Sequence, residues 1–324
     1  MQAWLCENPV GVEALQWKEL PTPQPKAGEV LVEIKAASLN FPDLLIVQNK
    51  YQHKPALPFV PGSEYAGVIA AVGEGVTQLK VGQSVACLSG TGGFATHTVA
   101  PAALCLPLPP GFPHEDAAAF IMIYATAHHA LVDRGQVKPG ETVLVLGAAG
   151  GVGTSAIQVA KVIGARVIAA ASTDDKCELC KTIGADATIN YSRENLRDAL
   201  KALTDGKGPD VVYDPVGGDL AEPALRSIAW RGRYLIIGFA SGTIPALPLN
   251  LPLLKGASLV GVFWGSFSRH EPKANAAMLA ELARWYGEGR IKPVIDRVMP
   301  MAELPAAFAH MGSRTVKGKL VLVN

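Results

Sequence analysis

A glycine-rich stretch at residues 147–153 contains the residue types that hold a dinucleotide phosphate. It reads Gly-Ala-Ala-Gly-Gly-Val-Gly and joins a buried apolar segment to an amphipathic one. Gly150 and Gly153 occupy the second and third glycine positions of the dinucleotide fingerprint, where a pyrophosphate approaches and a helix packs on its strand. Ala148 replaces the first glycine. A helix starting near Val152 would direct free N–H groups at phosphate; the alternative is a tight strand–helix turn that binds nothing.

The next apolar segment ends about twenty residues further on, at Ala171-Ser-Thr-Asp-Asp-Lys. A carboxylate here would hydrogen-bond the ribose 2′-hydroxyl of NAD. Ser172 and Lys176 offer a hydroxyl and a cation, which suit the 2′-phosphate of NADP. Asp174 and Asp175 favour NAD instead, since either could reach the ribose. Alternatively, Thr173 or Asp174 caps a helix and Lys176 is a solvated surface charge. The pattern favours NADP(H).

The elements that must position these residues change in character near Tyr124. Residues 1 to about 120 contain short strands punctuated by glycine and proline turns, which predicts an irregular, mostly antiparallel barrel-like domain. Further on, helical segments alternate with strands that are apolar on both faces, which predicts a doubly wound parallel sheet. The predicted strands begin at Thr142, Arg166, Ala187, Val211 and Arg233. We expect a discontinuous first domain, 1–123 and 258–324, and a nucleotide-binding domain, 124–257.

Composition restricts the class of protein. The chain of 324 residues is 49% hydrophobic and 18% charged, which predicts about two folded domains. Lys and Arg number 29 against 28 Asp and Glu, without a basic run, so no nucleic-acid partner is expected. No signal peptide or membrane span is evident, and five scattered cysteines suit a reducing compartment, so we expect a cytoplasmic protein with no membrane partner.

Taken together, these motifs resemble the zinc-independent quinone oxidoreductases of the medium-chain dehydrogenase/reductase superfamily, the group that includes zeta-crystallin. The resemblance covers the full length. Besides the glycine stretch, it includes Ile183-Gly-Ala-Asp, Val211-Val-Tyr-Asp-Pro-Val-Gly-Gly and Lys317-Gly-Lys-Leu-Val-Leu. It implies a Rossmann domain, with its doubly wound parallel sheet, plus a GroES-like, mostly antiparallel β barrel-like catalytic domain.

Missing ligands distinguish the chain from the zinc enzymes of the superfamily. Those enzymes carry Gly-His-Glu where this chain has Gly62-Ser63-Glu64, and their catalytic cysteine is absent from the segment 37–43. A catalytic zinc needs three protein ligands. The pair Cys177 and Cys180 has no second pair to complete a site. No metal is therefore expected.

The resemblance also implies cofactor contacts outside the fingerprint glycines. Tyr191 and Arg314 match positions that hold the 2′-phosphate. Phe263 and Trp264 could equally be buried strand residues. The remaining implied contacts lie in the glycine turn, along the nicotinamide and its ribose, or beside Asn40; they are Ala149, Gly151, Val152, Thr126, Gly238, Phe239, Ala240, Gly265 and Phe41.

Without zinc, the cofactor must supply the chemistry, and the protein orients it. The resemblance implies hydride transfer from NADPH to a small-molecule quinone or enone, with Asn40 and Tyr51 as hydrogen-bond donors to the acceptor oxygen. Alternatives are an enoyl-thioester or alkenal double-bond reductase, or an NADPH-binding crystallin-like or RNA-binding protein with weak catalysis. Segment 258–265 resembles the edge strand through which the family forms homodimers, and an unpaired apolar edge is unfavourable. We therefore expect a homodimer.

Overall fold

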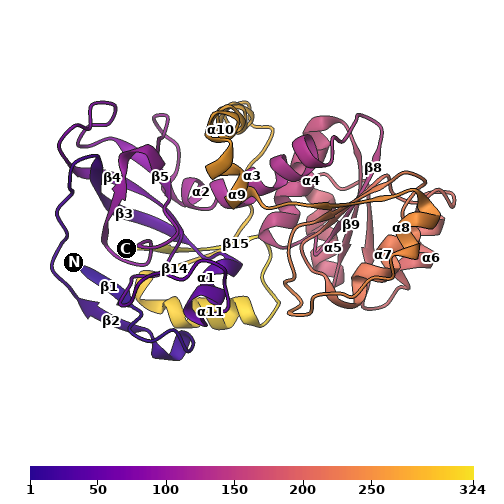
Figure 1. Cartoon of the computed structure of the whole chain (residues 1–324), viewed down its shortest axis with the longest axis horizontal. Coiled ribbons are helices and arrows are strands. Elements are labelled where there is room, and N and C mark those ends of the chain that lie inside the picture. Colours follow the sequence, from indigo (N-terminus) through magenta and orange to yellow (C-terminus); the bar gives the residue numbers. More distant parts are fainter. The chain divides into compact units, whose positions relative to one another are not determined.

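The structure, a computed structural model, describes residues 1–324 and divides them into two compact units. The first unit comprises Met1–Met122 and Ile295–Asn324, and the second comprises Ile123–Val294. Figure 1 shows the yellow carboxy-terminal segment returning to the indigo and purple strands of the first unit. The structure contains no helix that is both long and apolar enough to span a bilayer.

The first unit is built on a seven-stranded sheet in the order β14–β15–β3–β4–β5–β7, with β6 also paired to β3. The pairs are antiparallel except for the parallel β14 and β15. The strands, including the separate pair β1 and β2, are β1 Gln2–Leu5, β2 Gln16–Glu19, β3 Glu29–Ser38, β4 Glu64–Val72, β5 Ser84–Leu88, β6 His97–Pro101, β7 Cys105–Pro107, β14 Ile295–Pro300 and β15 Lys319–Val323. The helices are α1 Phe41–Val47, α2 His114–Ala118 and α11 Leu304–Gly312, with 3-10 turns at Val12–Ala14, Ala102–Leu104 and Met301–Glu303.

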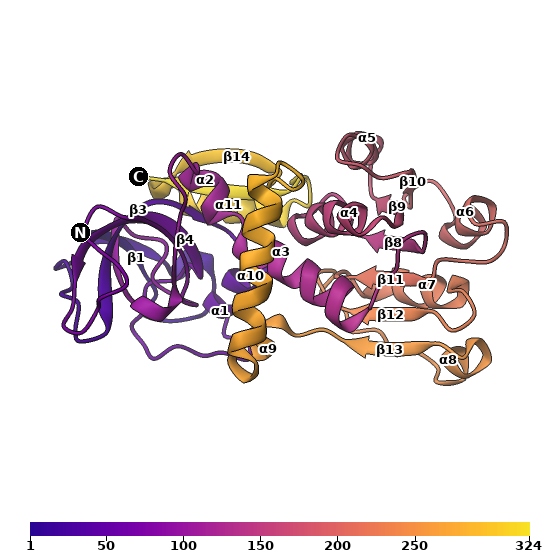
Figure 2. The same ribbon diagram turned by 90° about the horizontal axis from the view of Figure 1, so that it is seen from above.

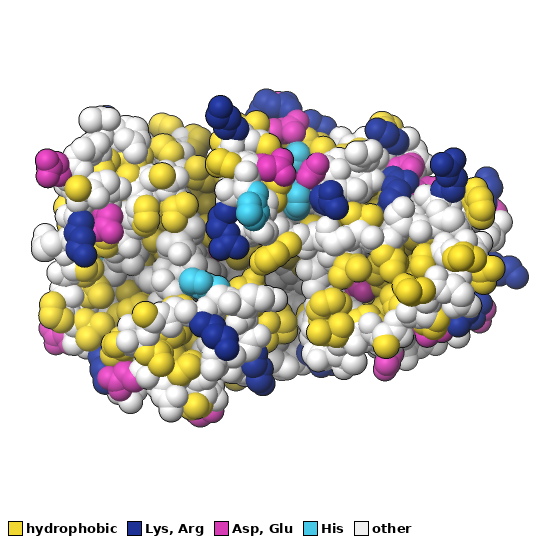
Figure 3. All heavy atoms as spheres, viewed as in Figure 1, with side chains coloured by type: hydrophobic (Ala, Val, Ile, Leu, Met, Phe, Trp, Pro, Cys, Tyr) yellow, Lys and Arg dark blue, Asp and Glu magenta, His cyan; other side chains and the backbone are white.

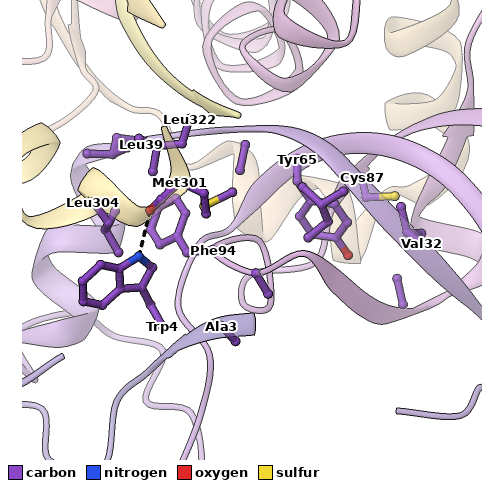
Figure 4. Packing of buried hydrophobic residues seen from close by; sticks show 14 of the residues in the cluster. Ala3, Trp4, Val32, Leu39, Tyr65, Cys87, Phe94, Met301, Leu304 and Leu322 are labelled. Carbon is purple, nitrogen blue, oxygen red and sulfur yellow. Dashed lines mark hydrogen bonds between the residues drawn. The ribbon is translucent and has the colours of Figure 1, made fainter. Parts of the chain in front are cut away.

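The core of the first unit joins the two ends of the chain. The Trp4 indole N–H donates to the Met301 carbonyl at 2.8 Å, and the Phe94 ring meets Phe308 edge-on with centroids 6.1 Å apart. Figure 4 shows Trp4, Phe94, Met301 and Leu304 packed together. The apolar area buried here stabilises the return of the carboxy-terminal segment to the amino-terminal strands.

The second unit contains a six-stranded, fully parallel sheet in the order β10–β9–β8–β11–β12–β13. Figure 2 shows the strands as a row with β13 at one end. The strands are β8 Thr142–Leu146, β9 Arg166–Ala171, β10 Ala187–Asn190, β11 Val211–Asp214, β12 Arg233–Ile236 and β13 Ser258–Gly261. The helices are α3 Ile121–His128, which crosses the unit boundary, a π-helical segment His129–Arg134, α4 Gly151–Ile163, α5 Asp174–Thr182, α6 Leu196–Leu203, α7 Ala221–Ser227, α8 Asn250–Lys255, α9 Trp264–His270, α10 Pro272–Gly287 and a 3-10 turn Gly218–Leu220.

Both faces of this sheet are covered. Leu144 and Leu146 of β8 pack in one cluster with α6 and α7. Val143 and Val145 point to the opposite face and are also fully buried, where α4 contacts β8 and β9. Burial on both faces explains why these strands read as continuous apolar runs. The predicted fold class is confirmed.

The structure differs from the expected domain boundary at residue 258. Ser258–Gly261 pairs in parallel with β12, so the strand extends the sheet of the second unit. The chain returns to the first unit only at Ile295, where β14 begins beside β15. The strand predicted over 258–265 is also shorter, because α9 begins at Trp264.

Candidate active site

The glycine turn after β8 is shaped by contacts that exclude side chains. Gly147 has φ 58°, a conformation that favours glycine. A Cβ on Gly153 would lie 2.5 Å from the Gly147 carbonyl oxygen and 2.7 Å from Ala148, so helix α4 packs too closely on the turn for any larger residue. A Cβ on Gly150 would meet nothing closer than 3.4 Å. Packing within the protein therefore requires Gly153, and the backbone conformation requires Gly147, whereas a Cβ on Gly150 would make only an ordinary van der Waals contact.

Residues predicted around these glycines line the same turn. Gly150 caps helix α4, and Ala149 precedes it as a buried residue, while Gly151 and Val152 are half-buried in the first turn of the helix. The N–H groups of the first turn of an α-helix lack partners within the helix. The turn therefore offers several backbone donors at a helix amino terminus, which favours an anion.

The turn after β11, which was not predicted to belong to the site, lies beside the glycine turn. Asp214 ends β11, and its carboxylate accepts from the N–H groups of Val216 and Gly217 at 2.8 and 2.9 Å and from the Tyr234 hydroxyl at 2.6 Å. A Cβ on Gly147 would approach Val216 at 2.7 Å. The strand order reverses between β8 and β11, which is where open α/β sheets bind ligands. In the sequence, this turn is marked only by the pair Gly217-Gly218 after a predicted strand.

The predicted nicotinamide residues follow β12 and continue this edge. Gly238 and Phe239 are half-buried and Ala240 is exposed, in the turn directly after the strand. A Cβ on Gly217 would lie 2.8 Å from the Phe239 ring. The turns after β8, β11 and β12 thus come together at the carboxyl edge of the sheet.

The turns after β9 and β10 meet where the ribose selectivity was predicted. Tyr191 and Ser192 follow β10, and the Ser192 hydroxyl donates to the Ser172 carbonyl at 2.8 Å. Lys176 is half-buried in the first turn of α5. Asp174 accepts from Arg193 at 2.5 Å and from the Asn190 amide at 2.8 Å, so its carboxylate is already bound.

Asp175 is bonded as well, since it accepts from the Thr173 hydroxyl. Both carboxylates that argued for NAD are therefore engaged with protein donors. Arg193, three residues after the predicted strand Ala187–Asn190, adds a cation that the sequence reasoning missed, and it pairs with Asp174.

Helices α3 and α9 hold the other predicted residues of the second unit. Thr126 is half-buried in α3, which packs on α4 through the Tyr124 hydroxyl donating to Gln158 at 2.9 Å. Phe263 is 51% exposed, whereas Trp264 is buried and its indole N–H donates to Asn275 at 2.8 Å. This bond gives Trp264 a structural role in joining α9 to α10, with Gly265 half-buried after it.

In the first unit, a buried polar cluster forms around Asn40, Glu64 and Lys319. The Lys319 ammonium donates to the Asn40 carboxamide oxygen at 2.6 Å and the Leu39 carbonyl at 2.7 Å, and lies 3.6 Å from Glu64. The Asn40 amide nitrogen donates to Glu64 at 3.0 Å. Burial lowers the pKa of Lys319, while the Glu64 carboxylate acts in the opposite direction. Both polar ends of the Asn40 amide are therefore fixed.

Glu64 accepts further hydrogen bonds, from the Ser38 hydroxyl at 3.2 Å and the Met122 N–H at 2.9 Å. Sequence reasoning placed Glu64 and Lys319 only within motifs and assigned neither to the site. Asn40 is at the end of β3 and Lys319 begins β15, so only the pairing of these distant segments reveals the cluster.

Helix α1 begins beside this cluster. Asp43 accepts from the backbone N–H groups of Asn40 at 2.8 Å and Ser63 at 3.0 Å. Burial raises the pKa of Asp43 to about 6, against the opposing effect of these hydrogen bonds. Phe41 is the first residue of the helix and is 38% exposed, and Tyr51 is half-buried in the bend after it.

Arg314 is in the first unit, in the turn after α11, and is exposed with φ 60°. Ser172, Lys176 and Tyr191 belong to the second unit.

The family is decided by comparison with known proteins. The model described as alcohol dehydrogenase GroES-like domain matches residues 26–110, and the model described as zinc-binding dehydrogenase matches 151–282. The chain is 39% identical over 303 residues to quinone oxidoreductase-like protein 2 of Bos taurus, covering 93% of this chain and 87% of that protein. The chain belongs to the quinone oxidoreductases of the medium-chain dehydrogenase/reductase superfamily. The resemblance inferred from its motifs is confirmed.

Two further members of this family are similar over nearly their whole length. The quinone oxidoreductase of Pseudomonas aeruginosa is 36% identical over 315 residues, covering 97% of this chain and 96% of that protein. The crystal structure of Escherichia coli quinone oxidoreductase complexed with NADPH has a TM-score of 0.93 at 30% identity, with both chains fully covered.

The zinc named by one family model does not fit the residues present. The structure contains no group of three or more His, Cys, Asp or Glu side chains placed to hold a metal ion. Beside Ser63, the Glu64 carboxylate is instead paired with the Lys319 ammonium. A cation within 3.6 Å already balances the charge that would attract a metal.

Proposed function

We propose that this protein transfers hydride from NADPH to a quinone or another electron-poor enone without a metal ion. Family membership makes the chain an oxidoreductase that uses NADP(H). The observation that carries the metal-free proposal is the Lys319 ammonium bonded to Asn40 and adjacent to Glu64. Bound NADPH supplies the hydride, and the side chains of this protein orient the reactants.

The second unit would bind NADPH along the carboxyl edge of its sheet. The lack of a side chain at Gly150 would let a pyrophosphate approach the N–H groups of Gly151, Val152 and the start of α4. Ser172, Lys176 and Tyr191 would hold the 2′-phosphate, and the family resemblance adds Arg314 as a further cation. The turn residues Gly238, Phe239 and Ala240, together with Thr126, Phe263 and Gly265, would line the nicotinamide and its ribose.

Asn40 is the proposed hydrogen-bond donor to the acceptor oxygen. An amide nitrogen carries two hydrogens, and the bond to Glu64 uses one of them. Lys319 holds the amide oxygen at 2.6 Å, which prevents the group from turning over and presenting an acceptor. The fixed N–H would stabilise negative charge that develops on a quinone or enone oxygen, and Tyr51 would act as a second donor.

A substrate and metal screen tests this function. We expect NADPH oxidation with 1,2- and 1,4-quinones to exceed NADH oxidation, and we expect no stoichiometric zinc by elemental analysis. Faster turnover of 2-alkenals or 2-enoyl thioesters than of every quinone would replace the quinone assignment by double-bond reduction. One zinc per chain that is lost together with activity would refute the metal-free mechanism.

We also propose a homodimer joined through β13. This strand ends the parallel sheet and exposes Leu259 by 36%, next to the half-exposed Phe263. The N–H groups of Ser258 and Val262 bond to the neighbouring strand, so by alternation the Leu259 N–H faces the open edge. Leu259→Pro removes that donor and should give a monomer in light scattering, whereas Leu259→Ala should stay dimeric; a monomeric native chain would refute the proposal.

An RNA-binding role has less support. Figure 3 shows positive and negative side chains interspersed on the face drawn, without a continuous basic surface. The nearly balanced charge, 29 Lys and Arg against 28 Asp and Glu, also argues against an RNA-binding surface. The cytoplasmic location inferred from cysteine usage remains a prediction.

A further inference from the structure

Two cysteines face each other at the end of the first unit's large sheet. Cys87 of β5 and Cys105 of β7 are directly opposite in the antiparallel register, and their sulfur atoms are 3.3 Å apart. Both are free thiols. Cys87 is fully buried and Cys105 is 5% exposed. Figure 4 shows Cys87 beside the ring of Tyr65 in the interior of this unit.

We propose that Cys87 and Cys105 form a reversible redox pair, which a hydroperoxide oxidises to an intramolecular disulfide. Residues directly opposite in antiparallel strands have Cα atoms about 4.5–5.5 Å apart, within the range that a disulfide spans. A covalent bond of about 2.05 Å requires the sulfur atoms to close by about 1.2 Å. Small rotations of two side chains can supply that movement without a change of strand register.

The two thiols differ in a way that assigns them roles. The Cys87 S–H donates to the sulfur of Cys105. This hydrogen bond lowers the pKa of Cys105 and raises the pKa of Cys87. Since the thiolate is the nucleophile, Cys105 is the residue that attacks the oxidant and Cys87 the one that resolves it.

The position of Cys105 also gives an oxidant access. Its strand β7 has three residues and is the last strand of the sheet, bonded only to β5 along that path. Short edge strands open locally at low cost in free energy. Opening of β7 exposes Cys105 while Cys87, in the interior strand β5, stays covered by β4.

The reaction balances with hydrogen peroxide as the oxidant. The Cys105 thiolate attacks one peroxide oxygen, an S–O bond forms as the O–O bond breaks, and the leaving hydroxide takes up a proton to become water. The Cys87 sulfur then attacks the Cys105 sulfur, the S–O bond breaks, and a second water leaves with the Cys87 proton. Two thiols lose two electrons in total, and one peroxide becomes two waters. A dithiol reductant reverses the change.

The helix cysteines Cys177 and Cys180 provide a matched control within the same chain. They are three positions apart in α5 and both buried. Burial raises the pKa of Cys177, and it raises the pKa of Cys180 to about 12. Neither is therefore activated as a nucleophile, although their C-x-x-C spacing is the one typical of redox motifs.

The test is a thiol count and a peptide map of the full-length protein. After treatment of the reduced protein with a few equivalents of hydrogen peroxide, we expect the thiol count in denaturant to fall from five to three, with one cross-link between Cys87 and Cys105. Dithiothreitol should restore all five. Five thiols retained, or a cross-link between Cys177 and Cys180, would overturn the proposal.

Variants separate the two roles. Cys105→Ser should retain its four thiols under the same treatment, whereas Cys87→Ser should stop at a sulfenic acid on Cys105 that dimedone traps. The double variant Cys177→Ser/Cys180→Ser should still lose two thiols. Loss of two thiols in Cys105→Ser would contradict the assignment. The peptide map of the native chain decides the main question even if a core variant fails to fold.

Discussion

Replacing Lys319 with methionine removes the cation from the buried cluster of Ser38, Asn40 and Glu64 while keeping most of the side-chain volume. At 3.6 Å and an effective dielectric constant of about 20, the attraction between the Lys319 ammonium and Glu64 is about 4–5 kcal/mol. Loss of one partner of a buried pair costs about 3–5 kcal/mol, because the other charge stays buried and uncompensated. We therefore expect Lys319→Met to destabilise the first unit by about 3–5 kcal/mol.

Hydrogen exchange measured by mass spectrometry suits this two-unit protein better than a single unfolding midpoint. A loss of about 3–5 kcal/mol corresponds to exchange that is faster by roughly 10²- to 10⁴-fold in β3, β4 and β15. Strands of the second unit, such as β8, serve as the internal reference. We expect their exchange to change little.

Two further variants make the reasoning refutable. In Lys319→Met/Glu64→Gln the unpaired charge is gone, so the loss should be smaller than the sum of the two single losses by about 2–3 kcal/mol. Lys181→Met removes an exposed pair with Glu178 at 3.3 Å and should cost less than about 1 kcal/mol. Additive losses in the double variant, or exchange in Lys319→Met within threefold of the native rate, would show that the pair is not coupled.

Three other outcomes follow from the site. Gly150→Ala should keep native stability but weaken NADPH binding at least tenfold in a fluorescence titration, whereas Gly153→Ala should lower the free energy of unfolding by about 1–3 kcal/mol because its Cβ meets the Gly147 turn at 2.5 Å; equal stability of the two variants would contradict the packing argument. Lys176→Ala should reduce the kcat/KM preference for NADPH over NADH about tenfold, while Lys181→Ala in the same helix leaves it unchanged; an unaltered preference in both would assign Lys176 to solvent. Because the folded pKa of Asp43 is raised from 3.8 to about 6, its protonated form stabilises the fold below pH 4 and this contribution, about 3 kcal/mol, is lost as pH rises through 6; urea titrations of Asp43→Asn should lack that decline.

Local sequence patterns were sufficient for the parallel sheet. Strands β8, β9 and β11 are buried on both faces along nearly their whole length, and this signal is contained within a few residues. The strand β14, which reads Ile-Asp-Arg-Val-Met-Pro, was missed, because it is half-exposed and mixed in composition. The assignment of β13 to the first domain was also wrong. This strand is short and mostly exposed, so only its pairing with β12 reveals the sheet to which it belongs.

The sequence by itself determined the fold class, the family and the glycine turn, because the requirements at Gly147 and Gly153 and the apolar pattern of the strands are local properties. Tertiary structure alone decided which side chains meet. Lys319 reaches Asn40 across 279 positions of sequence, and Cys87 faces Cys105 only because β5 pairs with β7. The burial that raises the pKa of Asp43 and the engagement of Asp174 by Arg193 are likewise products of packing. Electrostatics and thiol chemistry depend on distances between residues remote in the chain, which only the pairing of strands and the closure of the core establish.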